Sequence, residues 1–259
     1  MGGRTNAPVI PAAERQVFLR ALENGAVSDS SGELIHGAFF AALASRDAGL
    51  AREVHDGPVK PFTLSVLQAP EGRPAERILA GGEYWFRFTA MGPRAASLCL
   101  AWEGGQALRI GRIRFAIGEV RHPAEEAEVR ASGAFEIEFL SPAAFKCGDS
   151  HLPLPEPGLL WDGLDRKWAL ASGSPGEMIS ADAWRRVVRL REHELRTVAF
   201  RLRDCIIPGF VGRAVFETDK RAPADLRSRA ARLAAFARIA GVGVKTTVGM
   251  GQVRTRLLP

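Results

Sequence analysis

The stretch that decides the fold lies near the end of the chain: DLRSRAARLAAFARIA (residues 225–240), then GVGVKTTVGM (241–250), then GQVRTRL (251–257). The first segment repeats apolar residues at helical spacing against arginines, so it predicts an amphipathic helix. The glycines that follow can end a helix and let the backbone turn, and the last segment is predicted to be a strand. A loop between a helix and a following strand is neither a Walker loop nor a dinucleotide fingerprint, because both need a strand, then the loop, then a helix.

The same hydrophobic patterns, followed upstream, predict an element order that occurs twice. In the first half the expected strands are 16–22, 62–67, 83–90 and 107–120, and the expected helices are 33–46, 48–54 and 93–102. In the second half the expected strands are 133–140, 185–190, 195–204, 211–218 and 251–257, and the expected helices are 159–170 and 225–240. The charged segment 121–129 is the expected linker. We therefore predict an α+β protein of two tandem ferredoxin-like (RRM-like) domains, residues 1–125 and 126–259, each β-α-β-β-α-β with an antiparallel sheet.

The composition of the chain is that of a globular protein. Its 259 residues are 46% hydrophobic and 25% charged, which suits one large domain or two of ordinary size. We expect no membrane span, because no stretch approaches the roughly 18 apolar residues that one needs. We expect no signal peptide, because residues 1–14 are polar and rich in proline and alanine. Cys99, Cys147 and Cys205 are far apart and form no CxxC pair, so we expect reduced thiols, no metal, no cofactor and a cytoplasmic location.

The charge of the chain is basic, with a formal net charge of +6. Such a balance favours a polyanionic partner, either nucleic acid or an acidic membrane surface. The excess is almost entirely arginine, which is also the residue usage of a GC-rich genome. The charge by itself therefore leaves both explanations open.

Arginines crowd two predicted strands of the second half. Arg189 and Arg191 share one strand face, and so do Arg201 and Arg203. A ribbon with basic residues on one face can lie along a phosphate backbone. The alternative is an ordinary solvated strand face. Because most of these arginines lack interleaved acids in the sequence, we favour RNA contact.

The glycine-rich loop is a second candidate for phosphate contact. Gly243, Gly249 and Gly251 allow close approach of the backbone, and Lys245 stands between them. The alternative is a helix end followed by a bulged strand, and spacing alone favours that alternative.

Residues suited to acid–base chemistry occur at two places in the first half. His55 and Lys60 lie on a proline-constrained loop, and His36 lies one turn before Phe40 on the first predicted helix. RNA cleavage without a metal needs a base for the ribose 2′-hydroxyl, an acid for the leaving 5′-oxygen and a cation for the developing charge. Taken alone, the loop residues could also be exposed without function, and His36 could be an ordinary histidine at a helix surface.

Three blocks of sequence together resemble the CRISPR repeat-processing endoribonucleases, a RAMP-superfamily group that cuts precursor CRISPR RNA within its repeats. The blocks are IHGAFF (35–40) with AREVHDGPVKPFTLS (51–65), FLSP (139–142), and the glycine-rich run with KT (245–246) and GMG (249–251). The resemblance covers residues 15–259, and the order and spacing of the blocks make the combination specific.

The resemblance implies a metal-independent endoribonuclease that binds and cleaves CRISPR repeat RNA into guide RNAs. The ribose 2′-hydroxyl would attack and leave a 2′,3′-cyclic phosphate. His55 and Lys60 match the family's catalytic histidine and lysine. Some members have a tyrosine where this chain has Phe40, and helix geometry suggests His36 as a substitute. The implied RNA contacts are the glycine-rich loop and the basic ribbon, with Arg189, Arg191, Lys245 and Arg254 foremost.

Other functions and partners stay open at this point. Phe40 cannot exchange a proton, which motivates a non-catalytic repeat-RNA-binding subunit of an interference complex. A small-molecule enzyme that holds a phosphate in the glycine-rich loop would need an acidic or metal-binding cluster, and the sequence shows none. Beside CRISPR repeat RNA, the partners we consider are subunits of an interference complex and a second copy of the chain, but not a membrane.

Overall fold

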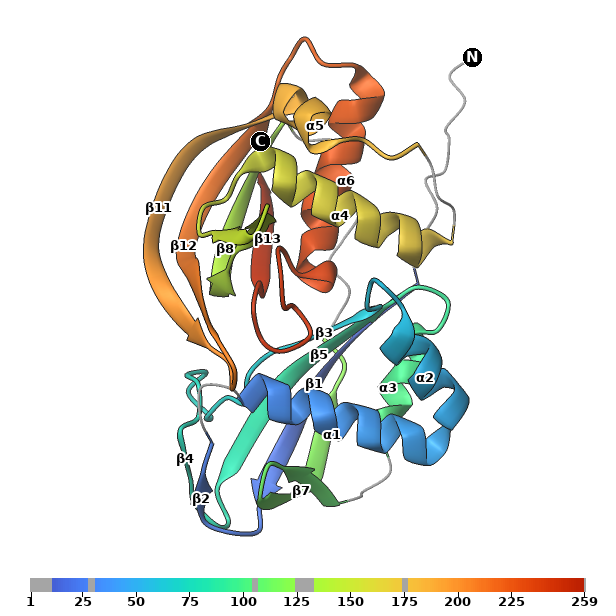
Figure 1. The fold of residues 1–259 in the computed structure, drawn as a ribbon, viewed down its shortest axis with the longest axis vertical. Helices are drawn as coiled ribbons and strands as arrows, with labels where there is room; N and C mark the ends of the chain where they lie inside the picture. Colours follow the sequence, from blue (N-terminus) through green and yellow to red (C-terminus); the bar gives the residue numbers. More distant parts are fainter. Residues whose placement is uncertain (1–10, 28–30, 104–106, 124–132, 174–176, 259) are drawn as a thin grey trace.

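The first half of the chain builds one antiparallel sheet with helices packed on it (Figure 1). This computed structural model describes residues 11–27, 31–103, 107–123, 133–173 and 177–258. The strands are β1 (Ala12–Ala21), β3 (Phe62–Leu64), β5 (Glu83–Met91), β6 (Ala107–Ile110) and β7 (Ile113–Arg121), beside a small ribbon of β2 (Gly25–Ala26) and β4 (Arg77–Ile78). The helices are α1 (Ser31–Arg46), α2 (Ala48–Asp56) and α3 (Ala95–Cys99). The strand order β3-β5-β1-β7 is that of a ferredoxin-like domain, with β6 added at the edge.

Alternating burial along β1 sets which face of this sheet is covered. Successive residues of a strand point to opposite faces, so Val17 and Leu19, which are two residues apart, share one face. Both are buried, and this face is therefore the covered one. On the covered face, the ring of Phe39 from α1 lies 4.5 Å from that of Phe62 in β3 and 5.6 Å from that of Trp102. These aromatic contacts hold α1 against β3, which matters because both elements carry candidate site residues.

The prediction of one strand over residues 107–120 is wrong in one respect. The chain turns back at Gly111, whose φ of +61° is easily reached only by glycine, so the segment forms the β6–β7 hairpin. The predicted helix at 93–102 is also shorter than expected. It consists of α3 followed by a 3-10 turn at Leu100–Trp102.

The second half repeats the arrangement (Figure 1). Its strands are β8 (Ala134–Ala143), β11 (Val188–Arg201), β12 (Ile206–Thr218) and β13 (Val253–Leu258), with a small ribbon of β9 (Phe145–Cys147) and β10 (Ser150–Leu152). Its helices are α4 (Pro157–Ser172), α5 (Ala181–Val187) and α6 (Ala224–Ala240). The order β11-β12-β8-β13 equals that of the first sheet, so the prediction of two tandem ferredoxin-like domains is confirmed.

The arginine-rich segment was predicted to form two strands, 185–190 and 195–204, but the structure shows a helix followed by one strand. Arg185 lies in α5, which begins where the side chain of Ser180 accepts a hydrogen bond from the amide of Ala183. From Val188 onward the chain forms one continuous strand, β11, with a register shift between Leu190 and Glu192. The hairpin of β11 and β12 is therefore longer than expected, and it reaches down toward the first domain (Figure 1).

A polar cluster joins the two domains where the end of α6 meets β1 and β5. Within the first domain, Arg87 Nε donates to Glu14 Oε1 at 2.7 Å. Across the junction, Arg87 Nη1 donates to Gln252 Oε1 at 2.8 Å and Nη2 donates to the carbonyl oxygen of Arg238 at 2.9 Å. The Arg238 guanidinium also pairs with Glu14. Burial by itself raises the pKa of Glu14, but the hydrogen bonds and charges of Arg87 and Arg238 outweigh it and bring that pKa below its ordinary value.

The glycine-rich loop also belongs to this junction. Its Thr246 carbonyl accepts a hydrogen bond from the amide of Leu64 in β3 at 3.0 Å. A small apolar cluster surrounds the contact and draws on both domains: Val66, Ala144, Phe200, Ile207 and Met250. The loop therefore holds the two domains together.

The predicted domain boundary at 125/126 and most of the predicted linker lie outside the described residues. The last strand described before the boundary ends at Arg121, and the next begins at Ala134. Within the described ranges, no helix combines the length and apolar character that crossing a membrane requires.

Candidate active site at the domain junction

The structure brings His36, Phe40 and His55 together, although they come from two helices. The rings of His36 and Phe40, one turn apart on α1, have centroids 5.0 Å apart. The ring of His55, near the end of α2, lies 5.3 Å from that of Phe40. The Phe40 ring thus contacts both histidines and, being a hydrocarbon, neither gives nor takes a proton.

Lys60 closes the loop that follows α2. Its ammonium donates to the carbonyl oxygen of His55 and, at 2.7 Å, to that of Gly57. An ammonium has three N–H donors, so one remains after these two bonds. His55 itself is largely exposed, with 69% of its side chain accessible, and its Nδ1 lies 3.2 Å from Asp56 Oδ1. Lys60 therefore fixes the backbone on which His55 stands and keeps a positive charge beside it.

The glycine-rich loop of the second domain contacts His36 directly. His36 Nδ1 lies 3.1 Å from the carbonyl oxygen of Thr247. A carbonyl oxygen only accepts, so Nδ1 carries the proton of this bond. In the neutral ring, Nε2 then has the free lone pair, which is the form that a general base requires.

The pKa of His36 favours the same protonation state. Burial lowers this pKa below its ordinary value, and the positive charges of Lys60 and His55 lower it further. The hydrogen bond to Thr247 and the charge of Glu33 act in the opposite direction without reversing the shift. His36 is therefore neutral near pH 7.

The glycines of the loop serve close packing within the protein. A Cβ at Gly249, which has a φ of +113°, would stand 2.6 Å from Val66 Cγ1. A Cβ at Gly243 or Gly251 would overlap a backbone carbonyl, that of Ala144 or Val242. Internal packing thus accounts for these glycines, and their predicted contact with RNA stays a prediction.

Lys245 differs from its neighbours in the glycine-rich loop. It is exposed, and it adopts a φ of +56°, which is uncommon for a residue with a side chain. Its carbonyl oxygen accepts from the amides of Val248 and Met250, so the loop structure itself stabilises this conformation. The loop therefore presents the charge of Lys245 to solvent.

Lys167 fixes the start of the loop, and no pattern in the sequence pointed to it. Its ammonium donates to the carbonyl oxygens of Ala240 (2.7 Å) and Gly241 (3.1 Å) and to Thr246 Oγ1 (3.3 Å). The carbonyls at the end of a helix lack partners within the helix, and this lysine supplies them. Burial lowers the pKa of Lys167 to about 7.

The base of the arginine ribbon is paired with acids. Arg189 pairs with Asp219, Arg191 with Glu192 at 2.9 Å, and Arg254 with Glu138 at 2.8 Å. The sequence favoured RNA contact because most of the ribbon arginines lack interleaved acids, but in the structure Arg189 has an acidic partner from outside β11. Their assignment as RNA contacts stays a prediction, although a phosphate would have to compete with a carboxylate at each of them.

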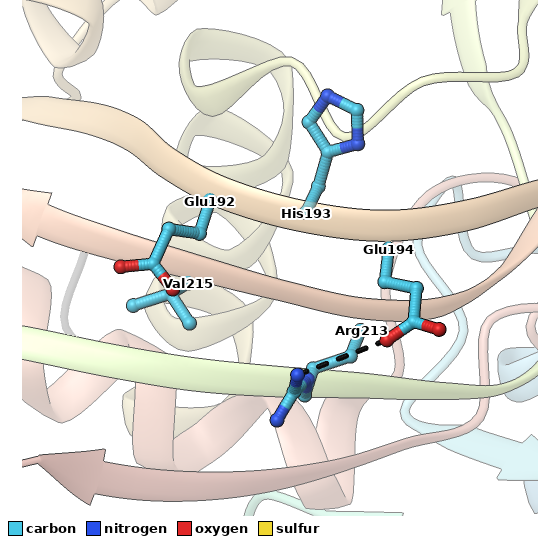
Figure 2. A pocket seen from close by; sticks show the side chains of 5 residues that line it. All are labelled: Glu192, His193, Glu194, Arg213 and Val215. Carbon is cyan, nitrogen blue, oxygen red and sulfur yellow. Dashed lines mark ion pairs between the residues drawn. The ribbon is translucent and has the colours of Figure 1, made fainter.

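A shallow hollow on the same hairpin confirms its mixed charge (Figure 2). It is lined by Glu192, His193, Glu194, Arg213 and Val215. Figure 2 shows Glu194 turned toward Arg213, and the two side chains form an ion pair at 3.8 Å. Carboxylates that line a hollow repel phosphate, so this part of the hairpin suits RNA less well than a purely basic ribbon would.

The tip of the hairpin lies beside the candidate site. The backbone amide of Arg203 donates to Glu33 Oε2 at 2.8 Å, and Glu33 precedes His36 by one turn on α1. Arg201 and Arg203 are exposed. The predicted basic residues thus separate by position into a group at the base of the hairpin and a group at its tip, where Arg203 pairs with Asp204 at 3.4 Å.

In the described part of the chain, no group of three or more histidine, cysteine or acidic side chains is arranged so that it could hold a metal ion. Of the cysteines, Cys99 is buried, and Cys147 and Cys205 are exposed; all three are free. Burial raises the pKa of the Cys99 thiol to about 11. The groups available for chemistry at the junction are thus histidines and lysine.

Known proteins with a similar sequence share one description. The sequence profile that matches residues 137–253 is that of the CRISPR-associated endoribonuclease Cas6. A protein of that name from Mycobacterium tuberculosis is 30% identical over 125 residues, which are 48% of this chain and 39% of the relative. One from Streptococcus thermophilus is 28% identical over 122 residues, 46% of this chain and 49% of the relative. The chain thus matches less than half the length of either curated relative.

The similarity in structure extends further than the similarity in sequence. A solved structure described as a Cas6 product complex superposes with a TM-score of 0.78 at 25% identity, over 95% of this chain and 100% of that one. A structure described as a RAMP protein has the same fold, with a TM-score of 0.67 at 14% identity over 94% of this chain and 99% of that one. The sequence profile, both curated relatives and the first of these solved structures carry the Cas6 description, so the resemblance to the CRISPR repeat-processing endoribonucleases that the motifs predicted is confirmed.

Proposed function

We propose that this protein binds CRISPR repeat RNA and cleaves it without a metal ion, leaving a 2′,3′-cyclic phosphate and a 5′-hydroxyl. The match of residues 137–253 to the Cas6 profile supports the substrate, and one similar solved structure is described as a product complex. The observation that carries the mechanism is the hydrogen bond between His36 Nδ1 and the Thr247 carbonyl, because it leaves Nε2 free as a base.

In the proposed reaction, His36 Nε2 takes the proton of the ribose 2′-hydroxyl. The 2′-oxygen then forms a bond to the adjacent phosphorus, and the bond from phosphorus to the 5′-oxygen breaks. This role differs from the sequence expectation, in which His36 only substituted for a tyrosine. The half-buried position and the lowered pKa of His36 support the change.

His55 and Lys60 complete the proposed reaction. His55, whose exposed ring contacts Phe40, gives a proton to the leaving 5′-oxygen. Lys60 has one ammonium N–H left for the charge that develops on the phosphate oxygens. Lys245, Arg201 and Arg203 are the exposed cations that we propose hold the RNA backbone.

One observation favours a second function, that of a repeat-RNA-binding subunit without catalysis. Phe40 lies between the two histidines, where a proton-exchanging residue would otherwise stand. Such a subunit would bind the RNA tightly in low salt and yield no product at any pH.

Incubation of the cognate repeat RNA with the protein in EDTA separates these functions. The proposed enzyme yields two fragments, of which the upstream one ends in a cyclic phosphate that acid opens. Intact RNA, bound but uncut across the pH range, would establish the binding subunit instead. Cleavage that appears only after a divalent metal is added would contradict the proposed mechanism.

The pH dependence of cleavage follows from the lowered pKa of His36. A base is active when deprotonated, so kcat/KM should fall as the pH drops through the pKa of His36. Because burial depresses that pKa, we expect the midpoint of the acid limb below the ordinary histidine value of about 6.5. A midpoint above that value, measured by single-turnover cleavage at several pH values, would contradict the assignment.

The two groups of the arginine ribbon should differ in their effect on RNA affinity. Removing Arg201 and Arg203 together should weaken binding and lower the slope of log affinity against log salt by about one for each phosphate that is no longer neutralised. Removing Arg189 and Arg191 should change both quantities less, because these side chains lie near the start of β11, at the opposite end of the strand from the tip that contacts α1. Equal reductions in affinity, measured by filter-binding titrations over a salt series, would contradict this distinction.

A further inference from the structure

Gly37 is a glycine in the interior of α1, directly after His36, and nothing inside the protein requires it. Its surface is exposed, and its backbone is helical. Glycine in a helix interior costs about 0.5–1 kcal/mol relative to alanine. A Cβ at this position would meet no atom within 4 Å. Neither backbone conformation nor packing therefore explains the absence of a side chain.

Other glycines near the site behave differently. A Cβ at Gly32, at the start of α1, would overlap the carbonyl oxygen of Val248, and one at Gly249 would stand 2.6 Å from Val66. These positions need glycine for contacts between the domains. At Gly37 the space that a side chain would fill is open to solvent, and this space lies beside His36.

The position of Gly37 lies between the two groups of residues that the proposed function uses. Glu33, four residues earlier on α1, holds the backbone of Arg203 at the hairpin tip. Phe40, three residues later, contacts the ring of His55. Residues three or four apart lie on one helix face, so Gly37, next to His36 in the chain, lies between the basic tip and His55 along α1.

We propose that the RNA backbone crosses α1 at Gly37 in direct contact with the helix, and that the missing side chain sets how closely the scissile phosphate approaches His36. The inference rests on the proposed function and adds a residue that determines substrate fit. An RNA strand held by Arg201 and Arg203 and cut at His36 and His55 passes over this surface. A side chain here would lift the strand away from the base.

The test replaces Gly37 by alanine and by leucine, and it uses Gly163 as a matched control. Gly163 lies in the interior of α4, and a Cβ there also meets no atom within 4 Å. Both alanine variants should raise the midpoint of thermal unfolding, because alanine favours helix more than glycine does. Gly37→Leu should slow single-turnover cleavage about 100-fold, since a displacement near 1 Å at a reacting centre has that effect. Gly37→Ala should fall between Gly37→Leu and the wild type, and Gly163→Leu should cleave as the wild type does.

Each outcome decides the inference. If the wild type cleaves the RNA and Gly37→Leu cleaves it at the same rate, the inference is overturned. A Gly37→Ala protein that unfolds at a lower temperature than the wild type also overturns it. If the wild type binds repeat RNA without cutting it, the affinity of Gly37→Leu relative to Gly163→Leu decides in the same way. A wild type that neither binds nor cuts the RNA overturns the proposed function first, and this result is distinct because it precedes any variant.

Discussion

Replacing His36 with alanine should slow cleavage of repeat RNA by about 10²–10⁴-fold, the range that general acid–base catalysis contributes. The reason is the arrangement of the imidazole, whose Nδ1 is directed at the Thr247 carbonyl while Nε2 is left as the proton acceptor. RNA affinity should change little, because the proposed phosphate contacts come from Lys245 and the hairpin tip. Single-turnover rates and equilibrium binding, measured on one RNA, separate the two quantities.

Two further histidine variants complete this experiment. His55→Ala should slow cleavage as well, since His55 is the proposed acid. His193→Ala is the matched control, because His193 is an exposed histidine of β11 that lines the hollow of the hairpin (Figure 2). A His36→Ala protein that cuts at the wild-type rate would contradict the assignment of the base.

Replacing Arg87 with methionine should lower the free energy of unfolding by about 3 kcal/mol, the lower end of the range for breaking a buried ion pair. The guanidinium links Glu14 of the first domain to Gln252 and the Arg238 carbonyl of the second, and only 14% of its side chain is exposed. The stabilisation is linked to pH. The folded pKa of Glu14 is lowered, so this contribution is complete above the ordinary pKa of 4.5 and is lost as the pH falls through the folded value.

Denaturant unfolding of Arg87→Met measures this decrease in stability, and Arg114→Met provides the comparison. Arg114 pairs with Glu23 at 2.6 Å on the surface, with 54% of its side chain exposed, and such pairs contribute about 1 kcal/mol or less. Arg87→Met should also slow cleavage, because His36 and the Thr247 carbonyl belong to different domains. An Arg87→Met protein as stable as Arg114→Met would contradict the role of the polar cluster.

Periodicity in the sequence predicted most of the fold. Helix α6 spans Ala224–Ala240 where residues 225–240 were expected, because its apolar residues recur at helical spacing. The hairpin turn at Gly111 and helix α5 were missed for a physical reason. Both depend on single local features, a positive φ and the Ser180 cap, which a hydrophobic pattern does not register.

The candidate site could be predicted only in part. His36, His55 and Lys60 were identifiable because their side chains have the required chemistry. The partner of His36 is a backbone carbonyl 211 residues further along the chain, and a carbonyl is present at every residue. Lys167 was missed for a related reason, since its partners are the carbonyls at the end of α6. Contacts to backbone across two domains leave no pattern in the sequence.

The most direct test of the central claim uses a repeat RNA with 2′-deoxyribose at the scissile nucleotide, in EDTA, beside the all-ribose RNA. The attacking group in our account is the 2′-hydroxyl, so the substituted RNA should bind with unchanged affinity and stay intact. The all-ribose RNA should be cut to a 2′,3′-cyclic phosphate under the same conditions. Cleavage of the deoxy-substituted RNA at that nucleotide would contradict attack by the 2′-hydroxyl.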